Sequence, residues 1–170
     1  MAAERILALD VGDKRIGLAI TDALGITAQP LFTLRRATLR ADLRAIARFI
    51  RQREVGIVVV GNPLNADGTE SRQAAKAQAF AKALEAEHPE LEHHLLDERL
   101  TTREAHELLD AAGRAPRAGF EVGGPASRGS RKEMRVSRTE IIDQVAATLL
   151  LEAFLSLRAG PALLPETEKP

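Results

Sequence analysis

The sequence of 170 residues contains no cysteine, no tryptophan and no tyrosine, and aromatic residues make up only 3% of it. The absence of cysteine excludes disulfide bonds, thiolate catalysis and cysteine-ligated metal sites, and it is consistent with a reducing compartment. Five phenylalanines are the only residues in the aromatic class. Base stacking on aromatic side chains is therefore not expected to carry any recognition of nucleic acid.

Long apolar runs and a net charge are absent as well. No apolar run approaches the roughly 18 residues needed to span a membrane, so no membrane partner is expected. Met1 leads straight into a strand-like run without the basic stretch and apolar segment of a signal peptide, which favours a cytoplasmic protein. Lysine and arginine together number 24, as do aspartate and glutamate, so the overall charge predicts no partner.

What is present is the composition of a globular chain, with 45% hydrophobic and 28% charged residues. The length suits one domain, which we place at residues 1–158. The proline- and glutamate-rich tail at 159–170 is expected to be disordered.

Basic residues are concentrated between positions 113 and 138. The basic side chains there are Arg114, Arg117, Arg128, Arg131, Lys132, Arg135 and Arg138, against the acids Glu121 and Glu133. This local excess would suit a polyanion, although a solvated loop without a partner explains it equally well. Residues 113–137 are also rich in glycine, proline and serine and show no periodicity, so they are predicted to form a mobile basic loop.

Hydrophobic periodicity predicts a mixed α/β sheet covered by helices. The expected strands are 5–11, 15–21, 26–34, 55–61 and 91–96, and the expected helices are 38–53, 70–88, 101–113 and 137–158. Pro30 indicates that the third strand is an edge strand or is bulged. Thr69 is predicted to cap the second helix, and Ser137 or Thr139 the last one.

Three carboxylates occupy positions that a structural role explains poorly. Asp10 closes the first apolar strand and Glu98 follows the fifth, and ligand sites in α/β sheets gather outside the carboxyl ends of strands. Asp143 lies near the start of the last helix, in line with apolar residues at spacings of four and three, so it should point toward the packed side. Favourable placement at a helix N-terminus would also explain Asp143 alone. Because all three should converge on one region, we predict an acidic site.

Three converging carboxylates repel one another unless they are protonated or neutralised by cations. Oxygen ligands favour a hard ion such as Mg²⁺ or Mn²⁺, and two such ions can clamp the attacking and leaving oxygens of a phosphodiester. The histidines lack metal-ligand spacing and are expected on the surface or on strand faces. They are His88, His93, His94 and His106.

The stretch DVGDKRIG, residues 10–17, has two interpretations. Its glycines could cradle the phosphates of a nucleotide, as in proteins of the actin and sugar-kinase type, or Asp10 could be a metal ligand. Nucleotide-binding proteins of that type need two domains closing round the ligand, and this chain supplies one. We therefore interpret Asp10 as a metal ligand, and Gly12 and Gly17 as residues of a turn that lets a nucleic-acid backbone approach.

Four motifs indicate a family. They are LALDVGDKRIGLAITD, VVVGNPLNADGTE, LLDERLTTREA and IIDQVAATLLLEAF, and they run in family order over roughly residues 5–157. The chain resembles the bacterial family of pre-16S ribosomal RNA nucleases, also described as Holliday-junction resolvases of the ribonuclease H-like superfamily. The resemblance implies a ribonuclease H-like fold, with a five-stranded mixed sheet flanked by helices.

The resemblance also implies roles for individual residues. It makes Asp10, Glu98 and Asp143 the catalytic, metal-binding acids, and it places Lys14, Arg15, Arg99, Lys132 and Arg135 along the nucleic acid. For Arg99, a contact with phosphate and a structural ion pair are both open. Two features depart from the family: Asp13 stands where many members have threonine, and the insertion GFEVGGPASRG has no counterpart.

The function expected from these features is a metal-dependent nuclease, using Mg²⁺ or Mn²⁺, that matures the 5′ end of pre-16S rRNA in ribosome biogenesis. Pre-ribosomal particles would then be partners of a monomer or homodimer. One alternative is an endonuclease that resolves Holliday junctions, which calls for a dimer with two sites. Another is a non-catalytic RNA-binding factor for ribosome maturation, although clustered carboxylates would be unfavourable near a phosphate backbone.

Overall fold

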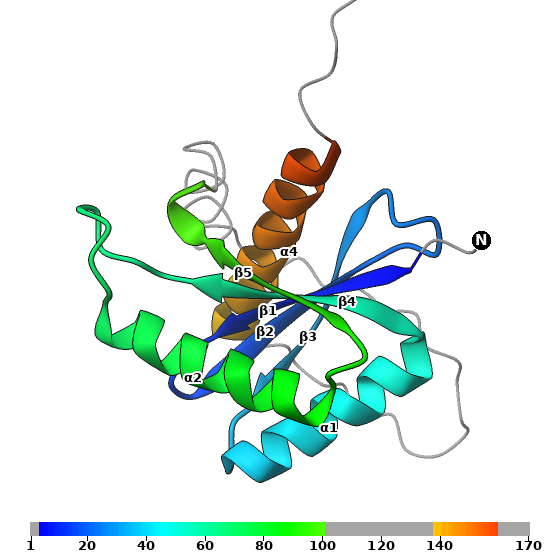
Figure 1. Cartoon of the computed structure of the whole chain (residues 1–170), viewed down its shortest axis with the longest axis horizontal. Coiled ribbons are helices and arrows are strands. Elements are labelled where there is room, and N and C mark those ends of the chain that lie inside the picture. Colours follow the sequence, from blue (N-terminus) through cyan, green and yellow to red (C-terminus); the bar gives the residue numbers. More distant parts are fainter. Residues whose placement is uncertain (1–3, 101–137, 160–170) are drawn as a thin grey trace, which may run out of the picture.

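The computed structural model describes residues 4–100 and 138–159, which form a five-stranded mixed sheet with helices on both faces (Figure 1). The strands are β1 (Arg5–Val11), β2 (Arg15–Thr21), β3 (Ala28–Arg35), β4 (Val55–Asn62) and β5 (Glu92–Asp97). Their order across the sheet is β3-β2-β1-β4-β5. The pairs β1–β2 and β2–β3 are antiparallel, whereas β1–β4 and β4–β5 are parallel. The predicted mixed sheet is therefore confirmed, with β1 at its centre.

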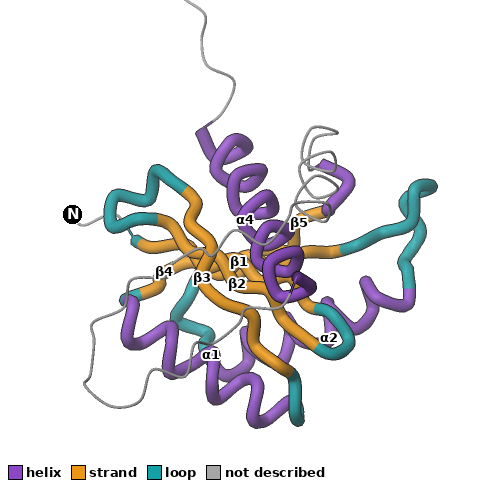
Figure 2. Tube along the Cα trace, turned by 180° about the vertical axis from the view of Figure 1, so that it is seen from behind, coloured by secondary structure: helices purple, strands orange, loops and turns teal. Residues whose placement is uncertain are grey.

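The helices lie in two layers. Helices α1 (Leu39–Arg53) and α2 (Arg72–Glu87) cover one face of the sheet, and α4 (Arg138–Ala159) covers the other (Figures 1 and 2). A short 3-10 helix, η1 (Glu98–Leu100), follows β5. Among the described residues, no helix is long and apolar enough to cross a membrane.

Strand β1 supplies side chains to two separate cores. Leu7 and Leu9 pack in the core that contains the apolar sides of α1 and α2, whereas Ile6 and Ala8 pack in the core that contains α4. Successive side chains of a strand point to opposite faces of its sheet. Asp10 continues the series of Ile6 and Ala8, so it lies on the face covered by α4.

Each of the first two helices begins at a hydroxyl cap. The Thr38 side chain accepts a hydrogen bond from Ala41 N, and the Ser71 side chain accepts one from Ala74 N. The prediction that Thr69 caps the second helix is wrong. Its hydroxyl instead bonds Asp67 Oδ1 at 2.6 Å, and its carbonyl accepts from Asn65 N at 2.9 Å. Thr69 is thus part of the turn that precedes α2, and the helix begins later.

The prediction for the third strand is confirmed, because β3 lies at the edge of the sheet and Pro30 pairs with Ala19 beside a register shift. The predicted helix at 101–113, the basic loop at 113–137 with Lys132 and Arg135, His106 and the Ser137 cap lie outside the described residues. Most of the tail at 159–170 lies outside them as well.

Candidate active site

Asp10 is flanked by a glycine on each neighbouring strand. It pairs with Gly17 of β2, and on β4 the register Leu9↔Val60 places Gly61 beside it. Paired residues on adjacent strands share a face of the sheet. Gly17 and Gly61 are thus the cross-strand neighbours of Asp10. On the face toward α4, no side chain from β2 or β4 therefore stands next to the Asp10 carboxyl group.

The backbone of α4 occupies the space over Gly17. A methyl group at position 17 would overlap the backbone carbonyl of Asp143. An isolated glycine in a strand often marks such a close approach of another backbone. Gly17 is therefore a packing residue within β2, and the prediction that it shapes the turn is wrong.

The carboxyl group of Glu98 occupies the space over Gly61. A methyl group at position 61 would overlap Glu98 Oε1 and would also crowd Leu150 of α4, whose Cδ2 would lie 3.3 Å away. Glu98 is the first residue of η1, directly after β5. Its side chain therefore reaches from the end of β5 over Gly61 of the neighbouring parallel strand, β4. The three predicted acids thus lie around neighbouring positions of β2, β1 and β4.

Asp143 is held by an ion pair with Arg15. Arg15 Nε donates to Asp143 Oδ2 at 2.6 Å, and both side chains are partly buried. Arg15 is the first residue of β2, so this pair ties the beginning of α4 to the strand that carries Gly17. Arg15 was expected to contact a phosphate, and in this structure its guanidinium contacts a catalytic candidate instead.

The environment of Asp10 and Glu98 disfavours their charged forms. Burial raises the pKa of Asp10 from 3.8 to about 6, and the negative charge of Asp143 adds to the rise. Burial raises the pKa of Glu98 from 4.5 to about 7, with further contributions from Asp10 and Asp97. Asp10 is therefore electrostatically coupled to both of the other acids, which lie on either side of it.

The donor chemistry of this site suits a hard divalent cation. Carboxylate oxygens are the ligands that Mg²⁺ and Mn²⁺ prefer, and a cation between Asp10 and Glu98 would offset the burial and the repulsion that raise their pKa values. In the described part of the chain, however, no three acidic or histidine side chains form a group that could hold an ion as they stand. One oxygen of Asp143, Oδ2, already accepts a hydrogen bond from Arg15 in this structure.

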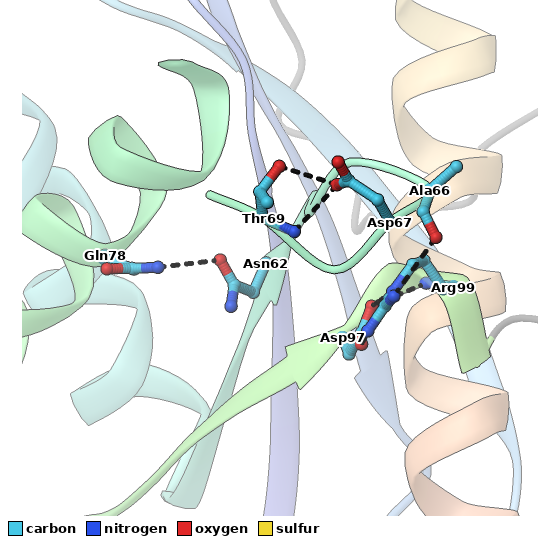
Figure 3. A network of polar contacts seen from close by, with 7 residues as sticks. All are labelled: Asn62, Ala66, Asp67, Thr69, Gln78, Asp97 and Arg99. Atoms are coloured by element: carbon cyan, nitrogen blue, oxygen red, sulfur yellow. Dashed lines mark hydrogen bonds and ion pairs between the residues drawn. The ribbon is translucent and has the colours of Figure 1, made fainter. Parts of the chain in front are cut away.

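Arg99 links the end of β5 to the loop between β4 and α2 (Figure 3). Its Nε donates to both carboxylate oxygens of Asp97 at 3.0 Å, and its Nη2 to Asp97 Oδ2 at 2.6 Å. Its Nη1 reaches the carbonyl of Ala66 at 3.5 Å and lies over Gly68, which has a φ of 85°. Of the two roles left open for Arg99, the structure contains the ion pair.

The remaining predicted residues are placed as follows. Lys14 is exposed in the turn between β1 and β2, and Asp13 beside it pairs with Lys76 of α2, which offsets the extra negative charge. The expectation of a surface or strand-face position is wrong for His88, which is buried at the end of α2, with its Nδ1 against Glu90. His93 and His94 lie on β5 as expected.

Sequence reasoning missed Gly61 and the partner of Arg15. Glycine inside an otherwise apolar, β-branched strand was an available signal for Gly61. No comparable signal joins Arg15 to Asp143, because the pair spans 128 positions and depends on how α4 packs.

A five-stranded mixed sheet in the order β3-β2-β1-β4-β5, with α1 and α2 on one face and α4 on the other, is the ribonuclease H-like fold. On this fold the candidate acids lie on the central strand (Asp10), directly after β5 (Glu98) and on the helix across the sheet (Asp143). The fold is similar to that of T. thermophilus RuvC, solved in complex with Holliday junction substrate, with a TM-score of 0.56 and 11% identity. That comparison covers 94% of this chain and 98% of RuvC, and it confirms the predicted fold.

Residues 4–122 match the RuvX family, described as Holliday junction resolvase, and the chain belongs to this family. A relative from Koribacter versatilis (strain Ellin345) is 42% identical over 155 residues, or 91% of this chain and 88% of the relative. A relative from Syntrophus aciditrophicus (strain SB) is 40% identical over 153 residues, which are 89% of this chain and 87% of the relative. Both relatives are named "Putative pre-16S rRNA nuclease". The resemblance seen in the sequence motifs is thereby confirmed.

Proposed function

We propose that this protein is a metal-dependent nuclease that processes the 5′ end of pre-16S rRNA, with Asp10, Glu98 and Asp143 as its catalytic carboxylates. The observation that carries the proposal is the row formed by Gly17, Asp10 and Gly61, over which the other two acids lie. Glycines on both sides of Asp10 give the acids from α4 and η1 room to approach it. The names of the relatives favour ribosomal RNA precursor as the substrate.

A divalent cation, Mg²⁺ or Mn²⁺, would supply Lewis-acid activation of water and would neutralise charge on the scissile phosphate. Asp10 and Glu98 are the residues that would hold it, because they lie beside each other and each is disfavoured as an uncompensated anion. Arg15 positions Asp143 at the edge of this site. Lys14, exposed in the adjoining turn, is placed to contact a phosphate of the substrate.

Arg99 supports the site from the side of β5. By pairing with Asp97 and reaching Ala66, it braces the end of β5 against the loop that follows β4. Glu98 lies between Asp97 and Arg99 in the chain, so this bracing fixes the backbone from which its carboxyl group projects. We assign Arg99 a positioning role.

A second candidate is cleavage of branched DNA, which is favoured by the family description and by the similarity in fold to RuvC. A nuclease with this site could act on either substrate, because RNA and DNA share the phosphodiester linkage that a metal-dependent nuclease hydrolyses.

The test is cleavage of a precursor-derived RNA and of a four-way DNA junction, side by side, in Mn²⁺. We expect the RNA to be cut faster by the wild-type protein and left intact by Asp10→Asn. Glu152→Gln, which changes an exposed acid on α4, is the matched control and should cut as the wild type does. Faster cleavage of the junction would favour the second candidate. Binding of RNA without metal-dependent cleavage of either substrate would indicate a non-catalytic factor.

A further inference from the structure

One exposed side of α1 carries a row of arginines. Arg40, Arg44, Arg48 and Arg51 follow one another at spacings of four, four and three, which places them along one side of a helix, and all four are exposed. The only acid in α1 is Asp42, which is 2% exposed and binds Arg36. The solvent-facing side of this helix therefore has four positive charges and no carboxylate. We call these four residues the α1 arginines.

The α1 arginines are not used within the fold. None of them forms an ion pair with any residue in 4–100 or 138–159, and the one hydrogen bond recorded among them joins Arg44 Nε to the backbone carbonyl of Arg40 at 3.3 Å. The neighbouring helix α2 differs. Its Lys76 pairs with Asp13, and its exposed Lys82 is followed three residues later by Glu85. At the C-terminal end of α1, Glu54 stands three residues after Arg51, whereas Arg40, Arg44 and Arg48 have no acid three or four residues away.

The row of positive charges also destabilises α1. Like charges four residues apart on a helix repel by a few tenths of a kcal/mol, here in the pairs Arg40–Arg44 and Arg44–Arg48. Arg40 lies in the first turn, where the helix dipole disfavours a positive charge. A repeated unfavourable feature on an exposed surface points to a role in binding.

The segment that leads into α1 is attached to the turn that follows Asp10. Arg36 N donates to the carbonyl of Lys14 at 3.0 Å, and Arg36 Nη1 donates to the carbonyl of Gly12 at 2.9 Å. From there α1 runs along the outside of the sheet (Figure 1). At 1.5 Å per residue, the interval from Arg40 to Arg51 covers roughly 16 Å. Helix α1 therefore begins beside the turn that carries exposed Lys14, and its arginines lie on the face of the sheet opposite the acids.

We propose that the α1 arginines bind the sugar-phosphate backbone of the nucleic acid beyond the bond that is cleaved. The inference rests on the proposed function, because it assigns a second region of contact to the same substrate. The apolar side chains of α1, such as Leu43, Ile46 and Ile50, are buried in the core and cannot insert into a lipid bilayer. A polyanion that approaches from solvent, rather than a membrane, is therefore the partner that this surface suits.

The test compares the salt dependence of RNA binding in the full-length protein, by fluorescence anisotropy in EDTA with a labelled precursor-derived RNA. Arg44→Gln/Arg48→Gln should weaken binding about tenfold and lower the slope of log affinity against log salt by about 1.4, since each phosphate contact on a single strand contributes about 0.7. Arg44→Lys/Arg48→Lys should keep the slope, because it keeps the charge. Lys82→Gln on α2 is the matched control and should keep both affinity and slope.

Each outcome has a distinct meaning. An unchanged slope in the double glutamine variant overturns the proposal, even if the wild type cleaves RNA. A lower slope without metal-dependent cleavage by the wild type supports the α1 arginines as a binding surface while the proposed function fails. Binding of anionic phospholipid vesicles that is lost in the glutamine variant, with RNA binding intact, also overturns the proposal. Melting temperatures at or above that of the wild type would show that the glutamine variant is folded.

Discussion

Asp10, the central residue of the proposed site, lies in an environment that disfavours its charge. The folded protein raises the pKa of its carboxyl group to about 6 and that of Glu98 to about 7, so folding favours their protonated forms. Since the folded state binds these protons more tightly than the unfolded chain, these two groups reduce stability progressively as pH rises from about 4 to 7. Above about pH 7 both groups are charged and the full destabilisation is present, unless a bound cation offsets it.

Asp10→Asn should therefore be more stable than the wild type at pH 8 without metal. The amide removes the desolvated charge and also lowers the repulsion on Glu98. We expect a gain of about 1–2 kcal/mol, discounted from about 1.4 kcal/mol per pKa unit because the site is partly open to solvent. Urea unfolding in EDTA at pH 8 and pH 4 measures the free energy of unfolding of both proteins. The difference between Asp10→Asn and the wild type should shrink toward zero at pH 4.

Asp13→Asn is the control for that measurement. A hydrogen bond and ion pair with Lys76 lower the pKa of Asp13, so its charge is favourable and its removal should not stabilise the protein at pH 8. Equal stabilisation by both substitutions, or none by Asp10→Asn, would contradict the desolvation argument.

Arg15 competes with a cation for Asp143. Because Arg15 Nε donates to Asp143 Oδ2 at 2.6 Å, a cation that binds this oxygen has to displace Arg15 from it. Arg15→Gln should raise the affinity for Mn²⁺ about fivefold, corresponding to about 1 kcal/mol for a partly exposed ion pair. Isothermal titration calorimetry with Mn²⁺ measures this directly.

Arg35→Gln provides the comparison for Arg15→Gln. Arg35 pairs with Arg15 across the β2–β3 ladder and also binds an acid of α4, Glu140, at 3.1 Å. Its removal changes the net charge equally but leaves Asp143 untouched. An equal gain in Mn²⁺ affinity from both variants would mean that only overall charge matters.

At the level of elements, the glycines in β2 and β4 set how closely α4 and η1 approach Asp10. Gly61→Ala would place a methyl group against the carboxyl end of Glu98, which can move aside, and 3.3 Å from Leu150 Cδ2, which would have to shift slightly. We therefore expect little loss of stability but a large loss of metal-dependent cleavage, because the Glu98 carboxyl group leaves its position. Thermal melting and cleavage rates measured on the same preparation test this.

Gly56→Ala is a control at the other end of the same strand, where its methyl group would meet the side chain of Glu4, including its Cβ. It should resemble Gly61→Ala in stability and retain cleavage. Gly17→Ala should behave differently from both, because its methyl group would meet the backbone of α4 and cost about 1–3 kcal/mol. Normal cleavage in Gly61→Ala would contradict the role given to Glu98.

The sequence was sufficient to predict the strands, the first two helices and the region in which Asp10, Glu98 and Asp143 lie. Periodicity and the position of acids after strands carry that information locally. Other features depend on contacts between distant segments. The packing of α4 on Gly17 and the capture of Asp143 by Arg15 are set by tertiary structure, and the local bonds of Thr69 with Asp67 overrode a simple capping rule.

On the scale of the whole molecule, the site lies where three segments meet that are far apart in the chain. Asp10 comes from the central strand, Glu98 from the end of β5 and Asp143 from the helix on the face opposite α1 and α2. The α1 arginines lie on the other side of the sheet, connected to the site by the turn after β1. A long nucleic acid could therefore contact both the acids and the outer surface of α1.

The most direct test of the account is the single-turnover rate of precursor RNA cleavage in saturating Mn²⁺ for Asp10→Asn, Glu98→Gln and Asp143→Asn. If the three acids form one catalytic site, each substitution should lower the rate by at least about 100-fold, a loss typical of removing one electrostatic contributor to a transition state. Glu152→Gln, on the same helix as Asp143, should cleave at the wild-type rate. A near-wild-type rate in any of the three variants would contradict the assignment of that residue, and in Asp10→Asn it would contradict the site as a whole.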